Sequence, residues 1–413
     1  MTADRSAVAD GTPPEVVHNS GAVEAPTRTA EGGGAPGSRR RRWITWVMLG
    51  ASGSWLVFVA AHRGLSGRVW WWNLPDLAPP LLFLAVPVLL LAALPLARPA
   101  RRVGAMPAVA ALVLGWPCAG VNIAALWHRP PPAPADAITV FSWNTWYWDQ
   151  LVRTGPRGEP IRDPDRFYRF LRAQAADVYL LQEHLYLDGQ DWSPLPVADP
   201  ERVRREFPGF HVAVSGELVT LSRFPIVLDR PVDLRPWLAR HWPALPPADS
   251  RLPDYHTVKT LRTDLLVFGS VLSFYNAHLY VPVVGLPTRG GGTAEDGLAR
   301  QDLREANYLA VAADVADNPH PVVLAGDLNT SPAMRQLRTL PDRLVDATPA
   351  LDSLYPTSWA RYGLPLWRLD WVFTTADVDV HRYRMVPAGG LSDHSGQLVV
   401  VSLQDCRERT SCR

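Results

Sequence analysis

The sequence contains few sulfur ligands and a single lysine. Three cysteines, Cys118, Cys406 and Cys412, occur in 413 residues, and their spacing matches neither a zinc site nor a Cys-x-x-Cys redox pair. The sequence therefore does not favour a thiolate metal site. Cys406 and Cys412 could close a small disulfide in an oxidising compartment, or remain two free thiols. Lys259 is the one lysine, and the other strongly basic residues are all arginine.

Net charge is also small, and acidic residues are nearly absent from one long segment. The formal net charge is +1, so no strong overall field recruits a polyanion, and nucleic acid is neither required nor excluded as a partner. The segment from Trp43 to Trp127 has hardly any acids, whereas most of them follow Ala137. The two parts of the chain are therefore expected to lie in different surroundings.

The first part predicts a membrane anchor. Residues 1–38 contain hardly any large apolar side chains and predict a disordered cytoplasmic N-terminus. Four arginines follow at 39–42, and then about 19 uncharged residues, the length that crosses a bilayer. Within a membrane region of residues 39–128 we expect three transmembrane helices, near 43–61, 77–97 and 103–127. Proline interrupts the second and third, which membrane helices tolerate.

Flanking arginines indicate the orientation of these spans. Residues 39–42 and Arg98, Arg101 and Arg102 fall on one side, and fewer arginines fall on the other. The richer side should be cytoplasmic, so three spans place the rest of the chain outside. A two-span topology would reverse this. A Pro-rich linker at 129–136 then precedes the second part.

The second part reads as an α/β domain over residues 137–403, with a C-terminal tail at 404–413. Short β-rich apolar runs alternate with helical stretches. Polar residues follow several expected strands, namely Asn144, Glu183, His278 and the segment Asp327 to Asn329; Asp370 opens another strand, and Asp393-His394 precedes the last. Such strand ends carry the sites of α/β proteins, and Mg²⁺ prefers oxygen ligands.

These segments together resemble the endonuclease/exonuclease/phosphatase superfamily of DNase I-like metal phosphoesterases. Seven blocks occur in the family order: Ser142-Trp143-Asn144, Leu181-Gln182-Glu183, Ser222-Arg223-Phe224-Pro225-Ile226, Asn276-Ala277-His278-Leu279, Gly326-Asp327-Leu328-Asn329, Arg368-Leu369-Asp370-Trp371-Val372-Phe373 and Ser392-Asp393-His394. The resemblance implies a four-layer α/β sandwich, with two packed β-sheets flanked by helices.

The resemblance also implies a metal site for Mg²⁺ or Mn²⁺. Glu183 would be the principal ligand, and Asn144 beside it would fix the carboxylate and the inner hydration shell. Asp393 would complete the site. We expect no other cofactor.

The same resemblance assigns catalytic roles to five residues. Asp327 would orient and deprotonate the attacking water, and Asn329 would hydrogen-bond the nucleophile or a phosphate oxygen. Asp370 would hold the imidazole of His394, and His278 would be the second imidazole that faces the phosphate.

Some of these residues also have ordinary structural interpretations. Asn144 and Asp370 could be turn or capping residues. His278 could be a core histidine, and Arg223 could serve the fold alone.

The side of the membrane on which the α/β domain lies determines which substrates it can reach. Our first hypothesis is a membrane-anchored hydrolase acting on an extracytoplasmic phosphoester, such as a lipid-linked phosphate of the cell envelope. Actinobacterial proteins associated with teicoplanin resistance are similar in layout. A tethered extracellular nuclease ranks lower, because no basic and aromatic stripe is evident. A non-catalytic resistance or binding factor is the third hypothesis, which the intact set of site residues disfavours.

Overall fold

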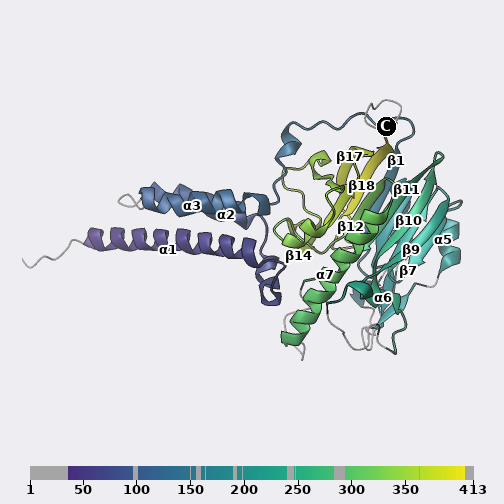
Figure 1. Cartoon of the computed structure of the whole chain (residues 1–413), viewed down its shortest axis with the longest axis horizontal. Coiled ribbons are helices and arrows are strands. Elements are labelled where there is room, and N and C mark those ends of the chain that lie inside the picture. Colours follow the sequence, from purple (N-terminus) through teal and green to yellow (C-terminus); the bar gives the residue numbers. More distant parts are fainter. Residues whose placement is uncertain are drawn as a thin grey trace, which may run out of the picture.

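The computed structural model of the chain has an elongated helical part and a β-sandwich (Figure 1). It describes residues 36–95, 101–148, 150–154, 160–162, 164–188, 193–197, 199–239, 246, 248–282, 294–361 and 363–404. Most of the segment 1–38 and both Cys406 and Cys412 lie outside the described residues. Cys118 is a buried free thiol.

Three apolar helices form the elongated part and lie side by side (Figure 1). They are α1 (Pro36–Leu65), α2 (Leu82–Ala93) and α3 (Arg101–Gly115), with short 3₁₀ turns η1 (Trp70–Asn73), η2 (Pro75–Leu77), η4 (Trp116–Cys118) and η5 (Ile123–Leu126). The sandwich lies at the end of α1 that carries Leu65, opposite the arginine-rich start of the helix (Figure 1).

The expectation of three separate membrane spans is not confirmed. In the described part of the chain only residues Arg42–Leu65 of α1, with mean hydropathy 1.7, are long and apolar enough alone. A second stretch is long and apolar enough only if Trp70–Leu77 and Leu82–Ala93, which meet at a bend of 62°, are counted as one span. The apolar helix Arg102–Cys118 is too short to cross alone. Pro79 and Pro80 stand at the bend, where each proline removes a backbone donor and its ring obstructs the preceding turn.

Two six-stranded sheets form the sandwich. The first sheet runs in the order β17 (Val378–Val386), β18 (Gly396–Leu403), β1 (Ile138–Asn144), β4 (Val178–Gln182), β8 (Leu218–Ser222) and β7 (His211–Ser215). The second runs in the order β13 (Val345–Asp346), β16 (Asp370–Thr374), β12 (Val322–Asp327), β11 (Ser270–His278), β10 (Val258–Val267) and β9 (Ile226–Asp233).

Shorter elements complete the described fold. The remaining strands are β2 (Gln150–Thr154), β3 (Pro160–Arg162), β5 (Leu185–Leu187), β6 (Pro194–Pro196), β14 (Trp359–Arg361) and β15 (Leu364–Trp367). The helices are α4 (Pro164–Ala173), α5 (Pro200–Glu206), α6 (Asp254–Thr257) and α7 (Ala294–Asp317), with 3₁₀ turns η6 (Arg235–Trp237), η7 (Arg335–Thr339) and η8 (Thr348–Ala350).

The two sheets pack face to face, and helices cover their outer faces. Val140 and Leu180 of the first sheet share one buried cluster with Leu265 and Phe274 of the second. On the outer face of the first sheet, α4 contributes Phe167 and other apolar residues at helical spacing. Helix α7 covers the second sheet in the same way. The chain therefore has an α/β fold with four layers.

Strand direction gathers the polar strand ends at one edge of the sandwich. Strands β1 and β4 are parallel and pair Asn144 with Gln182. Strands β11 and β12 are also parallel and pair His278 with Asp327. The antiparallel strand β16 starts at Asp370, directly opposite Asp327. Carboxyl ends of parallel strands meet at the same edge of a sheet, so the pairing itself brings these side chains together.

Gly326 permits the close pairing of β11 and β12 beside Asp327. Its φ angle is +148°, and a Cβ atom there would lie 1.9 Å from the carbonyl oxygen of Ala277. Only glycine fits, because any side chain would push the two strands apart.

We expect Gly326→Ala to lower the free energy of unfolding by about 3 kcal/mol or more, because a backbone oxygen must move. The matched control is Gly209→Ala, where φ is also positive (+80°) but nothing lies within 4 Å. That change should cost only about 1–2 kcal/mol, from the strained φ alone. Thermal unfolding of the full chain in detergent compares the two, and an equal loss in both would contradict the role of Gly326.

Candidate active site

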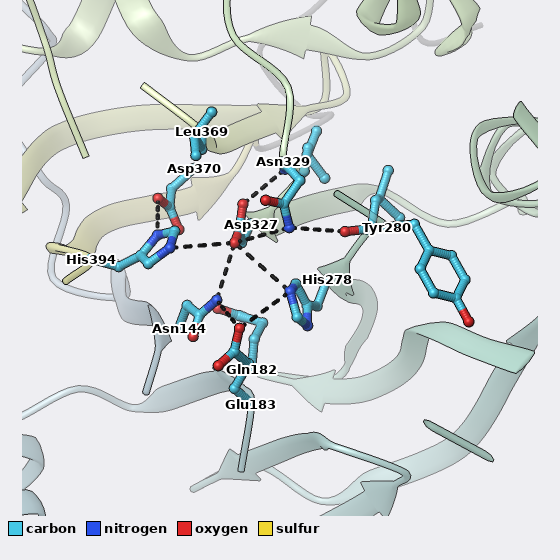
Figure 2. Close-up of polar contacts among 12 residues, drawn as sticks. Asn144, Gln182, Glu183, His278, Tyr280, Asp327, Asn329, Leu369, Asp370 and His394 are labelled. Atoms are coloured by element: carbon cyan, nitrogen blue, oxygen red, sulfur yellow. Dashed lines mark hydrogen bonds and ion pairs between the residues drawn. The ribbon is translucent and has the colours of Figure 1, made fainter. Parts of the chain in front are cut away.

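The carboxylate of Asp327 lies at the centre of the polar cluster (Figure 2). Its Oδ2 accepts hydrogen bonds from Asn144 Nδ2 at 3.0 Å and from Asn329 Nδ2 at 3.2 Å, and its Oδ1 accepts one from the Asn329 backbone N–H at 2.8 Å. Two imidazole nitrogens approach the same Oδ2, His394 Nε2 at 3.6 Å and His278 Nε2 at 3.8 Å. Donors from both sheets therefore surround one buried acid.

A second carboxylate holds each imidazole from behind. His394 Nδ1 lies 2.8 Å from Asp370 Oδ2. On the other side of Asp327, His278 Nδ1 lies 2.9 Å from Glu217 Oε1, and Lys259 Nζ donates a hydrogen bond to the same oxygen. The two rings thus turn their Nε2 atoms toward Asp327, which fixes their orientation (Figure 2).

Electrostatics favour the charged form of both imidazoles. Burial opposes the charge on His394, but Asp370 and Asp327 outweigh it and raise the pKa to about 10. Burial likewise opposes the charge on His278, yet Glu217 and Glu183 raise its pKa above the ordinary value. Burial would raise the pKa of Glu217, but His278 and Lys259 lower it to about 2. The acids around both rings therefore favour the protonated imidazole on either side of Asp327.

Glu183 directly follows strand β4 and has a left-handed backbone conformation, with a φ angle of +54°. Its side chain belongs to the cluster around Asp327. Its Oε1 accepts a hydrogen bond from Asn144 Nδ2 at 3.1 Å and lies 3.6 Å from His278 Nε2. The Asn144 Oδ1 atom is engaged elsewhere, since it accepts the Trp146 N–H at 3.0 Å. Asn144 therefore aligns the two acids Glu183 and Asp327 through its amide nitrogen.

Left-handed backbone conformations concentrate at the site. In the described part of the chain seven non-glycine residues have positive φ, and five of them belong to the site or to the loop after β1: Trp146, Tyr147, Trp148, Glu183 and Asn329. Each such residue costs of order 1–3 kcal/mol and persists only where the surroundings impose it. The strain is therefore localised where precise placement of side chains matters.

Two unpartnered carboxylate oxygens fit a divalent cation. Glu183 Oε2 and Asp393 Oδ1 are buried without a hydrogen-bond partner, and both residues line one pocket with Asp327, Asn329 and His394. A buried oxygen without a hydrogen-bond donor lowers the stability of the protein, so a partner is expected. Hard cations bind carboxylate oxygens of this kind. The donor set therefore suits a hard divalent cation.

The charge of the contact cluster supports the same conclusion. Five carboxylates, Glu183, Glu217, Asp327, Asp370 and Asp393, lie in or beside this contact network, together with the imidazoles of His278 and His394 and the ammonium group of Lys259. Burial raises the pKa of Glu183 and of Asp327, so a positive charge beside them would favour their ionised form. A divalent cation would supply that charge.

Asp327, Asp370 and His394 form another group whose ligand atoms lie within 4.8 Å of one another. Their contacts argue for proton transfer instead, because His394 Nδ1 is already paired with Asp370 and Asp327 Oδ2 already accepts two amide hydrogen bonds. Asp370 Oδ1 is also unpartnered, but Asp370 does not line the pocket, whereas Glu183 and Asp393 carry unpartnered oxygens and do line it.

The structure brings all eight residues expected from the sequence to one place. These are Asn144, Glu183, His278, Asp327, Asn329, Asp370, Asp393 and His394. Their catalytic and metal-binding roles stay predictions. Arg223 lies elsewhere: it packs on the ring of Phe210, and its Nε is 3.7 Å from Asp177 Oδ1.

Sequence reasoning missed three residues of the site. Glu217 stands in the turn between β7 and β8, where an acid is expected to be exposed, yet it is fully buried. Lys259 lies in strand β10, and its being the single lysine of the sequence is the only feature that could have drawn attention to it. Trp359, in strand β14, donates from Nε1 to Asp393 Oδ2 at 2.8 Å, a contact between residues 34 positions apart.

We expect Glu217→Gln to lower the free energy of unfolding by about 3–5 kcal/mol, because it leaves Lys259 buried and unpaired. The double variant Glu217→Gln/Lys259→Met removes both charges and should recover most of that loss. Both variants should lose activity, since neither holds His278 through a carboxylate. Thermal unfolding and turnover on the same preparations check this; a double variant as unstable as the single one would contradict it.

Comparison with known proteins places the chain in a family. The model of the endonuclease/exonuclease/phosphatase family matches residues 141–394, more than half of the chain. No protein of curated function matches the sequence.

Solved structures similar to this chain include an endonuclease/exonuclease/phosphatase from Beutenbergia cavernae (19% identity, 65% of this chain and 72% of that one covered, TM-score 0.43). A second is a sphingomyelinase C from Streptomyces griseocarneus (19% identity, 64% of this chain and 99% of that one covered, TM-score 0.41). A third is a mannosyl-6-phosphatase from Bacteroides thetaiotaomicron (14% identity, 64% of this chain and 100% of that one covered, TM-score 0.41). The family match, together with the geometry above, shows that this chain belongs to the endonuclease/exonuclease/phosphatase family, whose members typically hydrolyse phosphoesters.

Proposed function

We propose that the protein is a membrane-anchored phosphoesterase, dependent on Mg²⁺ or Mn²⁺, that hydrolyses a lipid-linked phosphate of the cell envelope outside the cytoplasm. The observation that carries the proposal is the pair of carboxylate-held imidazoles on either side of Asp327, beside acids with unpartnered oxygens. A non-catalytic binding factor would have no need of such an arrangement.

The residues divide the work of hydrolysis between them. Asp327 accepts the proton of the attacking water, and its raised pKa makes it a stronger base than an ordinary aspartate. The Asn329 and Asn144 amides, which donate to Asp327, keep its carboxylate in one orientation. When the water oxygen bonds to phosphorus, the ester P–O bond breaks on the opposite side.

The two imidazoliums stabilise the negative charge that develops on the phosphate. Nε2 of either ring can donate to a phosphate oxygen, and one of them supplies the proton that the leaving oxygen requires. His394 returns to its charged form easily because Asp370 stabilises it. A cation held by Glu183 and Asp393 would withdraw further charge from the phosphate oxygens.

The helical part supports membrane attachment. Only 11% of the most apolar window of α1 is buried inside the protein, so α1 is not a core helix. Of 28 exposed large apolar side chains in the described part of the chain, 18 lie between Trp43 and Trp127. An apolar surface of this extent needs a cover, and a bilayer provides one.

The arrangement of α1 supports an extracytoplasmic domain. The arginine run at 39–42 begins the helix, and the sandwich lies at its other end (Figure 1). If the arginine-rich side is cytoplasmic, a crossing by α1 places the sandwich outside, and this holds for one crossing or three. The resemblance in layout to teicoplanin-resistance proteins adds to this proposal for a cell-envelope substrate.

Activity should require a divalent cation. The full chain in lipid nanodiscs should release phosphate from a lipid phosphate with Mg²⁺ or Mn²⁺, and chelation should stop it. Glu183→Gln and Asp327→Asn should lower kcat by about 100-fold or more, because they remove a cation ligand and the general base. The matched controls Glu201→Gln and Asp352→Asn change exposed acids and should retain activity. Full activity of either site variant in chelator would overturn the mechanism.

The C-terminus should lie outside the cytoplasm. An alkaline phosphatase fused after Arg413 should be active in a bacterial host, because it folds only outside, and a green fluorescent protein fused there should stay dark. The reverse pattern would contradict the topology and direct the search toward cytoplasmic phosphoesters.

A further inference from the structure

The pocket over the candidate active site is lined by two unlike kinds of residue. Its volume is about 380 Å³, within the range of about 300–1,000 Å³ for small-molecule sites. The acids and His394 supply one kind of lining. The other is apolar and comes from distant parts of the chain: Leu77, Trp146, Val281, Met334, Trp359 and Trp367.

Two tryptophans connect the acids to the helical part. Trp359 donates from Nε1 to Asp393 Oδ2, and its ring centroid lies 6.4 Å from that of His394. The ring of Trp367 meets that of Trp359 edge to face, at 5.4 Å and 60°. Trp367 Nε1 in turn donates to the backbone oxygen of Leu77 at 3.0 Å. The apolar lining is therefore continuous from the phosphate site to Leu77.

Leu77 belongs to the apolar helices, not to the sandwich. It ends η2, directly before the bend into α2. Buried polar contacts fasten these helices to the sandwich: His62 Nε2 donates to Ala333 O at 2.8 Å, because its Nδ1 accepts from Trp72. Asn122 Nδ2 donates to Thr348 O at 3.0 Å and to Leu351 O at 3.1 Å. Leu77 is thus held in place as part of the pocket.

We propose that this apolar lining binds the hydrocarbon chain of the substrate. The substrate would then be the phosphate ester of a long-chain alcohol, which enters from the bilayer past Leu77 with its phosphate toward Asp327. Trp367 and Leu77 select for chain length. This inference rests on the proposed phosphoesterase function and adds the chemical class of the group that the phosphate carries.

The composition of the lining favours a hydrocarbon chain over a sugar. Sugar hydroxyls buried against Leu77, Met334 and Trp367 would lose their hydrogen bonds to water without replacement, which is costly. A hydrocarbon chain gains free energy from the same burial.

The composition also disfavours nucleic acid. Bases can stack on tryptophan, but a strand brings further phosphates that require cationic neighbours. Among the described residues that line the pocket, Arg361 is the only arginine or lysine, against three acids, Glu183, Asp327 and Asp393. The polar end of the pocket, with His394, serves one phosphate, whereas the apolar residues that line the rest of the pocket offer no positive charge to the further phosphates of a strand.

The test uses the full chain in nanodiscs with a series of alkyl phosphates of increasing chain length, each below its micelle concentration. Wild type should prefer the long chains in kcat/KM. Trp367→Ala and Leu77→Asn should lower the ratio of long-chain to short-chain kcat/KM by about tenfold or more. Trp237→Ala, a matched change at a half-exposed tryptophan that does not line the pocket, should leave the ratio unchanged.

Trp367→Phe separates the apolar role from a structural one, since it keeps an apolar ring but loses the hydrogen bond to Leu77. It should retain most of the chain-length preference. Wild type that hydrolyses short and long chains equally, or cleaves a single-stranded oligonucleotide in preference, would overturn the inference and leave the phosphoesterase function standing.

Absence of hydrolysis with every phosphate and cation would instead overturn the proposed function. Calorimetric binding of the same alkyl phosphates then decides the inference on its own. Tighter binding of long chains that Trp367→Ala weakens would support it, and binding independent of chain length would overturn it.

Discussion

The rest of the site depends on one constraint: the buried carboxylate of Asp327 needs hydrogen-bond donors and positive charge around it. Asp327 ends a central strand, and burial of its charge is costly unless other groups pair with it. Its donors come from both sheets: Asn144 closes β1 of the first, and Asn329 follows β12 of the second. The complete set of donors around Asp327 therefore depends on the packing of the two sheets against each other.

The fold tolerates local cost to hold this geometry. Glu183 and Asn329 adopt left-handed φ angles, and Gly326 lets two strands approach more closely than any side chain would allow. Behind His278, a second buried acid, Glu217, is neutralised in part by Lys259, whose ammonium lies 3.9 Å from the ring centroid of Tyr255. These strained and charged positions lower the stability of the fold, and the packing of the two sheets offsets that loss.

The sequence predicted the eight central residues because each stands next to a strand in the chain, where a local pattern reveals it. Glu217, Lys259 and Trp359 act through contacts between remote segments, and a turn acid or a strand tryptophan carries no local sign of such a partner. The three separate spans are not confirmed, for a different reason. Apolar composition was read correctly, but Pro79 and Pro80 break the helix between η2 and α2, and composition alone does not show where a helix ends.

The central claim is that the unpartnered oxygens of Glu183 and Asp393 hold a divalent cation beside Asp327. The most direct measurement is anomalous X-ray diffraction from crystals of the full chain grown with Mn²⁺. We predict one strong anomalous peak within ligand distance of Glu183 and Asp393. A peak bound only by Asp327, Asp370 and His394, or no peak in the pocket at saturating Mn²⁺, would contradict the account.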